Sequence, residues 1–173
     1  MMQRFLVVSD SHGNRDCLVE LADRYRGEVD GMFHCGDSQL EPDDSLWSDF
    51  LVVTGNCDFD PRFKKEQLVK LGDETIFMTH GHLFNVNSSI ANLLYRSQEL
   101  NASMAFYGHT HALGAELINN VLVVNPGSIC FPRGRYRIKT YAVVTVDEKS
   151  YQVEFYNQNH ECQRELSCSF SKG

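Results

Sequence analysis

Long apolar runs are absent from this chain of 173 residues. A membrane-spanning helix needs about 20 consecutive apolar residues, and no stretch of the sequence approaches that length. Near the N-terminus the apolar run covers only residues 5–8 before the polar pair at Ser9 and Asp10. That run is too short for the apolar segment of a signal peptide. We therefore expect a cytoplasmic protein with no membrane partner.

The sequence also lacks paired cysteines and an excess of basic residues. None of its six cysteines forms a CxxC pair, which argues against a structural zinc knuckle and, without a secretion signal, favours reduced thiols. The formal net charge is −7, which argues against a protein that wraps long nucleic acid. A small phosphate ester stays compatible with this charge, because bound metal ions can reverse the local sign of a site.

What is present, in the first part of the chain, is an alternation of strands and helices. Apolar runs predict buried strands at 4–9, 31–35 and 50–54. Helical spacing of apolar residues predicts a helix at 16–26, and a short helix should precede the third strand. This order favours an α/β fold with a largely parallel sheet and right-handed crossovers.

The second part of the chain is richer in antiparallel strands. We first expect a strand within 70–79, a helix at 87–100 that Asn87 or Ser88 caps, and a strand at 104–107. Two hairpins should follow, at 115–118 with 121–124 around Asn119-Asn120, and at 140–146 with 151–156. The polar tail, 157–173, should fray or cover a sheet edge. Residues 1–173 are expected to form one domain.

Five short polar motifs follow predicted strands, where open α/β sheets place their sites. They are Asp10-Ser11-His12-Gly13, Gly36-Asp37, Gly55-Asn56-Cys57-Asp58, His80-Gly81-His82 and Gly108-His109-Thr110-His111. Carboxylates, a carboxamide and imidazoles without cysteine suit Mn, Fe, Co, Ni or Zn. One catalytic ion needs about three protein ligands. The larger number here favours two ions that share a bridging carboxylate.

In this order, the motifs D-x-H, G-D, G-N, H-G-H and G-H-x-H resemble the calcineurin-like metallophosphoesterase superfamily. The short chain and the GNCD form resemble its small prokaryotic phosphodiesterase group. The likeness covers residues 1 to about 156 and includes Asn125-Pro126-Gly127-Ser128. It implies a four-layer α/β/β/α sandwich of two mixed sheets flanked by helices, with the metals at the top.

The resemblance also implies the ligand sets. One divalent ion would be bound by Asp10, His12, Asp37 and His111, and the other by Asp37, Asn56, His80 and His109. A hydroxide between the ions would then attack phosphorus in line. The imidazoles must be unprotonated to bind, so metal loading should fail below about pH 6. Manganese is the first choice of metal, with Fe, Zn, Ni and Co as alternatives.

One position departs from much of that superfamily, in which a histidine follows the Asn and is thought to protonate the leaving oxygen. Here this position is Cys57, as in the small prokaryotic group. A thiol with a pKa of about 8.5 is a poorer general acid than an imidazolium. We therefore assign Asn56 and Cys57 catalytic roles, with slow turnover expected for esters whose leaving groups are poor.

Other polar residues keep two interpretations each. His82 is a substrate or ligand-supporting contact, or a packing residue. Asp58 anchors a ligand histidine or caps the next turn. His34 should be a buried core histidine with satisfied hydrogen bonds. His160 could bind a metal with Cys162 and Cys168, although simple exposure in the tail is favoured.

Two segments also have an ordinary structural interpretation. Asp10-Ser11-His12 alone could cap the following helix, and His109 and His111 could be an exposed pair on one strand face. A third segment is basic: Arg133, Arg135, Arg137 and Lys139 alternate and on an extended segment would share a face. They could grip a second phosphate or an acidic partner, but a solvated strand is the favoured interpretation.

These observations together predict a metal-dependent phosphodiesterase that acts on a small phosphate ester. The alternatives are a phosphomonoesterase of broad specificity and a metal-poor scaffold of the same fold, like the subunit of the eukaryotic retromer complex. The full set of seven candidate ligands favours the enzyme. Long duplex substrates are not expected, whereas short oligonucleotides or cyclic nucleotides remain open, as does a homo-oligomer.

Overall fold

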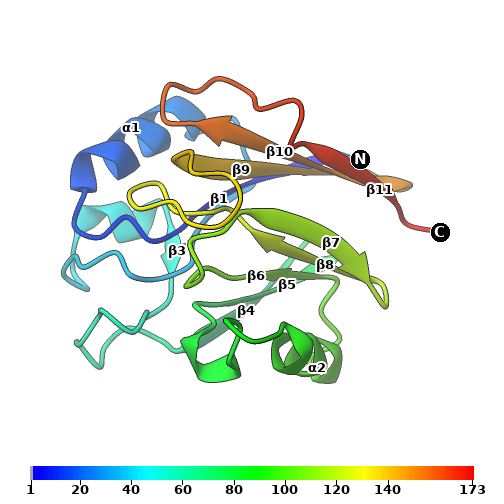
Figure 1. The fold of residues 1–173 in the computed structure, drawn as a ribbon, viewed down its shortest axis with the longest axis horizontal. Coiled ribbons are helices and arrows are strands. Elements are labelled where there is room, and N and C mark those ends of the chain that lie inside the picture. Colours follow the sequence, from blue (N-terminus) through cyan, green and yellow to red (C-terminus); the bar gives the residue numbers. More distant parts are fainter. Residues whose placement is uncertain (1) are drawn as a thin grey trace.

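Two β-sheets, packed face to face between two helices, form the computed structural model, which describes residues 2–173. In Figure 1, α1 (Arg15–Tyr25) covers the sheet that contains β1, and α2 (Ala91–Glu99) covers the other sheet from below. Both sheets mix parallel and antiparallel pairs. The predicted four-layer α/β/β/α sandwich of two mixed sheets is therefore confirmed.

The first sheet has the strand order β11-β10-β9-β1-β2-β3. Its strands are β1 (Gln3–Val8), β2 (Gly31–His34), β3 (Leu51–Val52), β9 (Thr140–Val146), β10 (Ser150–Asn157) and β11 (Cys168–Ser171). The parallel trio β1, β2 and β3 is the predicted crossover unit, with the short helix η1 (Ser45–Ser48) before β3. Part of the polar tail pairs with β10 as β11 and covers that sheet edge.

The second sheet has the order β4-β5-β6-β8-β7. Its strands are β4 (Glu66–Leu71), β5 (Glu74–Thr79), β6 (Met104–Phe106), β7 (Gly114–Ile118) and β8 (Val121–Asn125). The hairpin around Asn119-Asn120 is confirmed, and both residues have the positive φ that a tight hairpin turn needs. The sequence prediction missed β4, because its side chains are at most half-buried and give no strong apolar pattern. The strand forms a hairpin with β5.

Alternation along the strands divides the core into layers. Phe5 and Val7 of β1 face the second sheet, whereas Leu6 and Val8 pack toward α1. Phe77 of β5 belongs to the cluster that contacts α2. A strand buried on both faces reads as a continuous apolar run, which is why residues 4–9 were recognisable.

The predicted helix at 87–100 begins later than expected. α2 starts at Ala91, its cap position is Ile90, and no side chain caps it. The side chain of Asn87 instead contacts His109, so the prediction of a cap at Asn87 or Ser88 was wrong. The α1 cap is Asn14, which accepts a hydrogen bond from the Cys17 amide, so Asp10-Ser11-His12 is not a helix cap.

The basic segment is not a strand. Residues 131–139 form an irregular loop that joins the second sheet to β9, drawn in yellow in Figure 1. Arg133, Arg135 and Arg137 are exposed on this loop, so the expectation of one extended basic face was wrong. In the part of the chain that the structure describes, neither helix has the length and apolar character to span a membrane.

Candidate metal centre

The candidate ligands lie on loops at one end of the sandwich. The loops follow β1, β2 and β3 in the first sheet and β5 and β6 in the second, and these are parallel strands within each sheet. Backbone φ is positive at five of the predicted ligands, namely Asp10, His12, Asp37, His109 and His111. For residues other than glycine this conformation costs of order 1–3 kcal/mol each, and such strain gathers at functional sites.

Asp10 is the buried centre of the cluster. Its Oδ2 accepts hydrogen bonds from Ser9 Oγ at 2.6 Å and from the His109 amide at 3.1 Å. Its Oδ1 is buried and has no hydrogen-bond partner within residues 2–173. Nε2 of His111 nevertheless lies 3.1 Å from that oxygen, and Nε2 of His80 lies 3.7 Å away. A buried carboxylate oxygen that faces imidazole nitrogens without a hydrogen bond is the arrangement expected of a cation site.

Three imidazoles are oriented by carbonyl oxygens. Nδ1 of His12 contacts Gln39 Oε1 at 2.9 Å, Nδ1 of His80 contacts the Cys35 carbonyl at 2.7 Å, and Nδ1 of His111 contacts the Phe131 carbonyl at 2.6 Å. A carbonyl oxygen only accepts, so each Nδ1 carries the hydrogen. The Nε2 lone pairs are thereby left for the interior of the cluster, which is the tautomer that metal-binding histidines adopt.

Asn56 joins the cluster from the loop after β3. Its Oδ1 lies 3.1 Å from Nε2 of His80 and 3.0 Å from Nδ1 of His109. His80 Nε2 also lies 3.2 Å from Oδ2 of Asp37. On the other side, Nε2 of His12 lies 3.3 Å from Nε2 of His111 and 3.9 Å from Asp37 Oδ2. The structure thus brings all seven predicted ligands together, with Asp37 between the two groups.

Several of these side chains could hold a cation jointly. Three sets have potential ligand atoms within 4.8 Å of one another: Asp10, His12 and His111; Asp10, Asp37 and His80; and His12, Asp37 and Cys57. Oxygen and imidazole donors suit divalent transition metals. The donor chemistry and the orphaned Asp10 oxygen both fit divalent cations.

The charges within the cluster depend on one another. Burial works to raise the pKa of Asp10, but its contacts with His111 and His12 outweigh burial and hold that pKa well below its usual value. Contact with Asp10 raises the pKa of His12. Burial opposes protonation of His80, yet Asp37 and the charge of Asp10 outweigh it, so its pKa is also raised. Protons therefore compete with a cation for the same nitrogens.

Two motif glycines allow the carboxylates to approach the backbone. A Cβ on Gly108 would lie 2.1 Å from Ser9 Oγ and 2.5 Å from Asp10 Oδ2. A Cβ on Gly55 would lie 2.0 Å from Asp37 Oδ1. Both distances are far shorter than van der Waals contact, so each glycine is required by the position of a carboxylate.

Asp58 fixes the loops that carry Asp37 and Asn56. Its Oδ2 accepts from the backbone amides of Asp37 and Gly55, and its Oδ1 accepts from the amide of Gln39, each at 2.8 Å. These partners are backbone amides, whereas the sequence led us to expect that Asp58 anchors a ligand histidine or caps the next turn. Asp58 therefore positions one candidate ligand through the main chain.

Cys57 and His82 flank the cluster. The Cys57 amide donates to Asp37 Oδ1 at 2.8 Å, and burial, together with the charge of Asp37, raises the pKa of its thiol. The thiol therefore keeps its proton at neutral pH. The His82 ring lies 5.4 Å from that of His80, and its Nδ1 is buried without a hydrogen-bond partner in the described chain. His82 thus adjoins the cluster, as expected.

Three supporting side chains escaped the sequence analysis. Gln39 orients His12, and Asn87 Nδ2 lies 3.1 Å from His109 Nε2. Asn125 donates to the Gly108 carbonyl and to Thr110 Oγ1, which braces the loop that carries two histidines. Of these, only Asn125 had a signal in the sequence, because it belongs to the quoted Asn-Pro-Gly-Ser motif.

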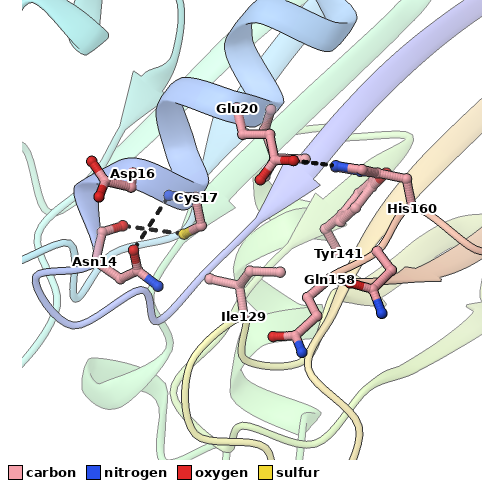
Figure 2. A pocket seen from close by; sticks show the side chains of 10 residues that line it. Asn14, Asp16, Cys17, Glu20, Ile129, Tyr141, Gln158 and His160 are labelled. Atoms are coloured by element: carbon pink, nitrogen blue, oxygen red, sulfur yellow. Dashed lines mark hydrogen bonds and ion pairs between the residues drawn. The ribbon is translucent and has the colours of Figure 1, made fainter.

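The two remaining histidines lie elsewhere. His34 is buried, with Ser11 Oγ at 2.9 Å from Nε2 and the Gly36 amide donating to Nδ1, and burial lowers its pKa to about 4. It is the satisfied core histidine that was predicted. His160 lines the separate cleft of Figure 2, where its Nε2 contacts Glu20.

Neither interpretation of His160 that the sequence offered holds in the structure. Nδ1 of His160 lies 2.8 Å from the hydroxyl of Tyr141 (Figure 2), which extends the contact to a buried side chain. The contacts of His160 are therefore with α1 and β9. The favoured interpretation, simple exposure in the tail, was wrong, because only 12% of the His160 side chain is exposed. The alternative, a metal site with Cys162 and Cys168, is not formed among the described residues, and Cys162 contacts Glu154 and Ser167 instead.

Comparison with known proteins decides the family. The model of the calcineurin-like phosphoesterase superfamily domain matches residues 3–149. The chain belongs to the calcineurin-like phosphoesterase superfamily. This domain is 43% identical over 153 residues to the probable metallophosphoesterase YsnB of Bacillus subtilis, with 88% of this chain and 90% of YsnB covered. Family membership supports phosphoester hydrolysis and the binding of divalent metal ions.

Two further relatives of this phosphoesterase domain are informative. A crystal structure of a predicted phosphoesterase from Streptococcus pneumoniae superposes with a TM-score of 0.97 at 43% identity, covering 99% of this chain and 98% of that one. The phosphodiesterase MJ0936 of Methanocaldococcus jannaschii is 27% identical over 167 residues, with 84% and 95% coverage. The first likeness extends over nearly the whole sandwich, including β11.

Proposed function

We propose that this chain is a two-metal phosphodiesterase. The observation that carries the proposal is the buried, unpartnered Oδ1 of Asp10, with the Nε2 atoms of His111 and His80 at 3.1 and 3.7 Å. Seven oxygen and imidazole donors exceed what one catalytic ion needs. The name of the M. jannaschii relative, a phosphodiesterase, supports the same class of reaction.

The proposed ligand sets are those expected from the sequence. Asp10, His12, Asp37 and His111 would hold one ion, and Asp37, Asn56, His80 and His109 the other. Two divalent cations, preferably manganese, would supply a hydroxide near neutral pH and neutralise charge on the phosphoryl oxygens. The grouping of Asn56 with His80 and His109 on one side and His12 with His111 on the other supports this division.

The residues of the chain have separate tasks in this proposal. Gln39 and the carbonyls of Cys35 and Phe131 hold three imidazoles with Nε2 inward. Asp58 fixes the loop of Asp37 through its backbone amide. The Cys57 thiol, whose pKa is raised by burial and by the charge of Asp37, would protonate the leaving oxygen. No side chain is needed as a general base, because two bound cations would lower the pKa of the attacking water enough to supply hydroxide.

Hydrolysis of paired chromogenic substrates tests the proposal. Bis-p-nitrophenyl phosphate and p-nitrophenyl phosphate should be compared with added Mn²⁺ and after treatment with a chelator. The proposal predicts metal-dependent turnover with preference for the diester. His111→Ala should abolish it, whereas His160→Gln, a histidine outside the cluster, should leave it intact. Preference for the monoester would replace the diesterase with a monoesterase, and turnover that survives the chelator would refute the metal centre.

A further inference from the structure

A second hollow opens directly beside the metal centre. It has a volume of about 560 Å³, within the range of pockets that hold small organic ligands. Gln39 and Cys57 line it. The same two residues contact the metal centre, since Gln39 Oε1 lies 2.9 Å from His12 Nδ1 and the Cys57 amide donates to Asp37. The cleft therefore borders the candidate metal centre through these two residues.

Five of the ten residues that line this cleft are apolar. These are Leu40, Pro42, Phe59, Pro61 and Phe63. The ring of Phe59 is 88% exposed, whereas Phe63 at 8% forms a buried part of the wall. An exposed aromatic ring beside a cleft offers a flat face on which another ring can stack.

The charged side chains of this cleft argue against a ligand group that is itself negatively charged. Three carboxylates line the cleft, those of Glu41, Asp58 and Asp60. Arg62 pairs with Asp60 at 2.8 Å but does not itself line the cleft. Among the described residues that line it, none is Lys or Arg, so a second phosphate would meet like charge without a cationic partner.

We propose that this cleft binds an uncharged aromatic ring of the diester substrate, with Phe59 as the residue that stacks on it. The inference rests on the proposed function, because it names the substrate class of the same site. The ring belongs to the alcohol part of the ester, which is either a phenol or a nucleoside. In the cleft it lies next to Cys57. Phe59 thus selects aromatic over aliphatic diesters by contact with the ring.

The chain has a built-in reporter for this cleft. Its single tryptophan, Trp47, packs edge-to-face on Phe63 with ring centroids 6.1 Å apart. The Trp47 indole also donates to the Glu41 carbonyl at 2.8 Å. Both contacts are with residues that line the cleft. Occupation of the cleft should therefore change the emission of Trp47 without any need for turnover.

The test titrates Trp47 emission with three probes: diphenyl phosphate, the dinucleotide UpU and dimethyl phosphate. Each titration is done with the metal-loaded protein and again in chelator. Saturable changes are expected with the two aromatic probes and not with dimethyl phosphate. Phe59→Ala should weaken the aromatic response about tenfold, the loss typical of one stacked ring. Tyr95→Ala, which removes another exposed aromatic ring on α2, away from the cleft, is the matched control.

The results separate this inference from the proposed function. A Phe59-dependent response to both aromatic probes supports ring recognition, and a response to one alone identifies its source as phenolic or nucleosidic. Equal affinities for diphenyl and dimethyl phosphate, or an unchanged response in Phe59→Ala, would overturn the inference even if diesters are hydrolysed. A normal Phe59-dependent response without hydrolysis would instead refute the proposed function. Since Phe59 is exposed, its truncation should not disturb folding.

Discussion

Oδ2 of Asp58 accepts a hydrogen bond from the backbone N–H of Asp37 at 2.8 Å, across 21 positions of the sequence. The same oxygen accepts from the Gly55 amide, so one side chain joins the loops after β2 and β3. The placement of Asp37 between the two groups of histidines depends on this contact. The position of Asp37 in the candidate centre is therefore held by main-chain hydrogen bonds to a residue that is not itself a candidate ligand.

Replacing Asp58 should loosen both loops. Asp58→Ala leaves three amides without their acceptor, and we expect the free energy of unfolding to fall by about 2–3 kcal/mol. Denaturant unfolding of the metal-free protein measures this loss. Asp60→Ala, which removes a carboxylate two residues away that pairs with the exposed Arg62, should change stability little. Equal stabilities of the two variants would mean that Asp58 does not hold the loops.

Gly108 is predicted to be intolerant of any side chain. The Cβ of Gly108→Ala would collide with Ser9 Oγ and Asp10 Oδ2, and displacement of Asp10 should weaken metal binding by about tenfold to a hundredfold. Calorimetric titration with Mn²⁺ measures the affinity. The control is Gly114→Ala in β7, where an added Cβ meets no atom within 4 Å. Wild-type affinity in Gly108→Ala would contradict the description of the Asp10 pocket.

The Cys57 thiol should limit turnover of esters with poor leaving groups. Its raised pKa keeps the proton in place but makes it a weak acid. Cys57→His should therefore accelerate alkyl esters by about tenfold or more, since general acids contribute large factors, while p-nitrophenyl esters gain little. A plot of rate against the pKa of the leaving group measures the difference. A rate independent of that pKa in the native protein would contradict the description of Cys57 as a weak acid that limits turnover.

Metal binding should release protons and strengthen as pH rises. The pKa values of His12 and His80 are raised above 6.5 in the metal-free protein, so both rings carry protons below that pH and must lose them to a cation. Loading should weaken as pH falls through these raised values, which lie higher than the pH of 6 expected from the sequence. Calorimetry in two buffers of different ionisation enthalpy counts the protons released. Release that is absent at pH 7 would contradict the pairing with Asp10 and Asp37.

The same shifts predict how the metal-free fold responds to pH. Because the pKa values of His12 and His80 are higher in the folded state, their stabilising contribution is complete below about pH 6.5 and is lost as pH rises through the folded values. Asp10 and Asp37 have lowered pKa values, so their contribution is present above about pH 4 and declines as pH falls toward the folded values. Denaturant midpoints over this range check both directions.

The elements that sequence patterns predicted are those with strong local signals. Continuous apolar runs identified β1 and β9, and Asn119-Asn120 identified the β7–β8 turn. β4 was missed because its residues are only half-buried, and pairing with β5 defines it. The start of α2 was misplaced because Asn87 contacts His109, a tertiary interaction that local propensity does not contain.

The residues of the candidate metal centre also differ in whether the sequence alone could indicate them. Its seven candidate ligands have side chains with recognisable metal chemistry at motif spacing, so the sequence indicated them. Gln39 and the Phe131 carbonyl orient histidines that are 27 and 20 positions away. The Phe131 contact has no sequence signature, because any residue supplies a backbone carbonyl. Gln39 acts through its side-chain amide oxygen, but it lies outside the five motifs and its amide does not by itself indicate metal chemistry. Supporting contacts of this kind become visible only when the fold brings the loops together.

The number of ions that the chain binds tests the central claim most directly. Protein stripped with a chelator, reconstituted with Mn²⁺ and separated from free metal should contain two ions per chain by elemental analysis. Asp37→Ala, which removes the carboxylate between the two groups, should lower that number. A stoichiometry of one or none in the native protein would contradict the account.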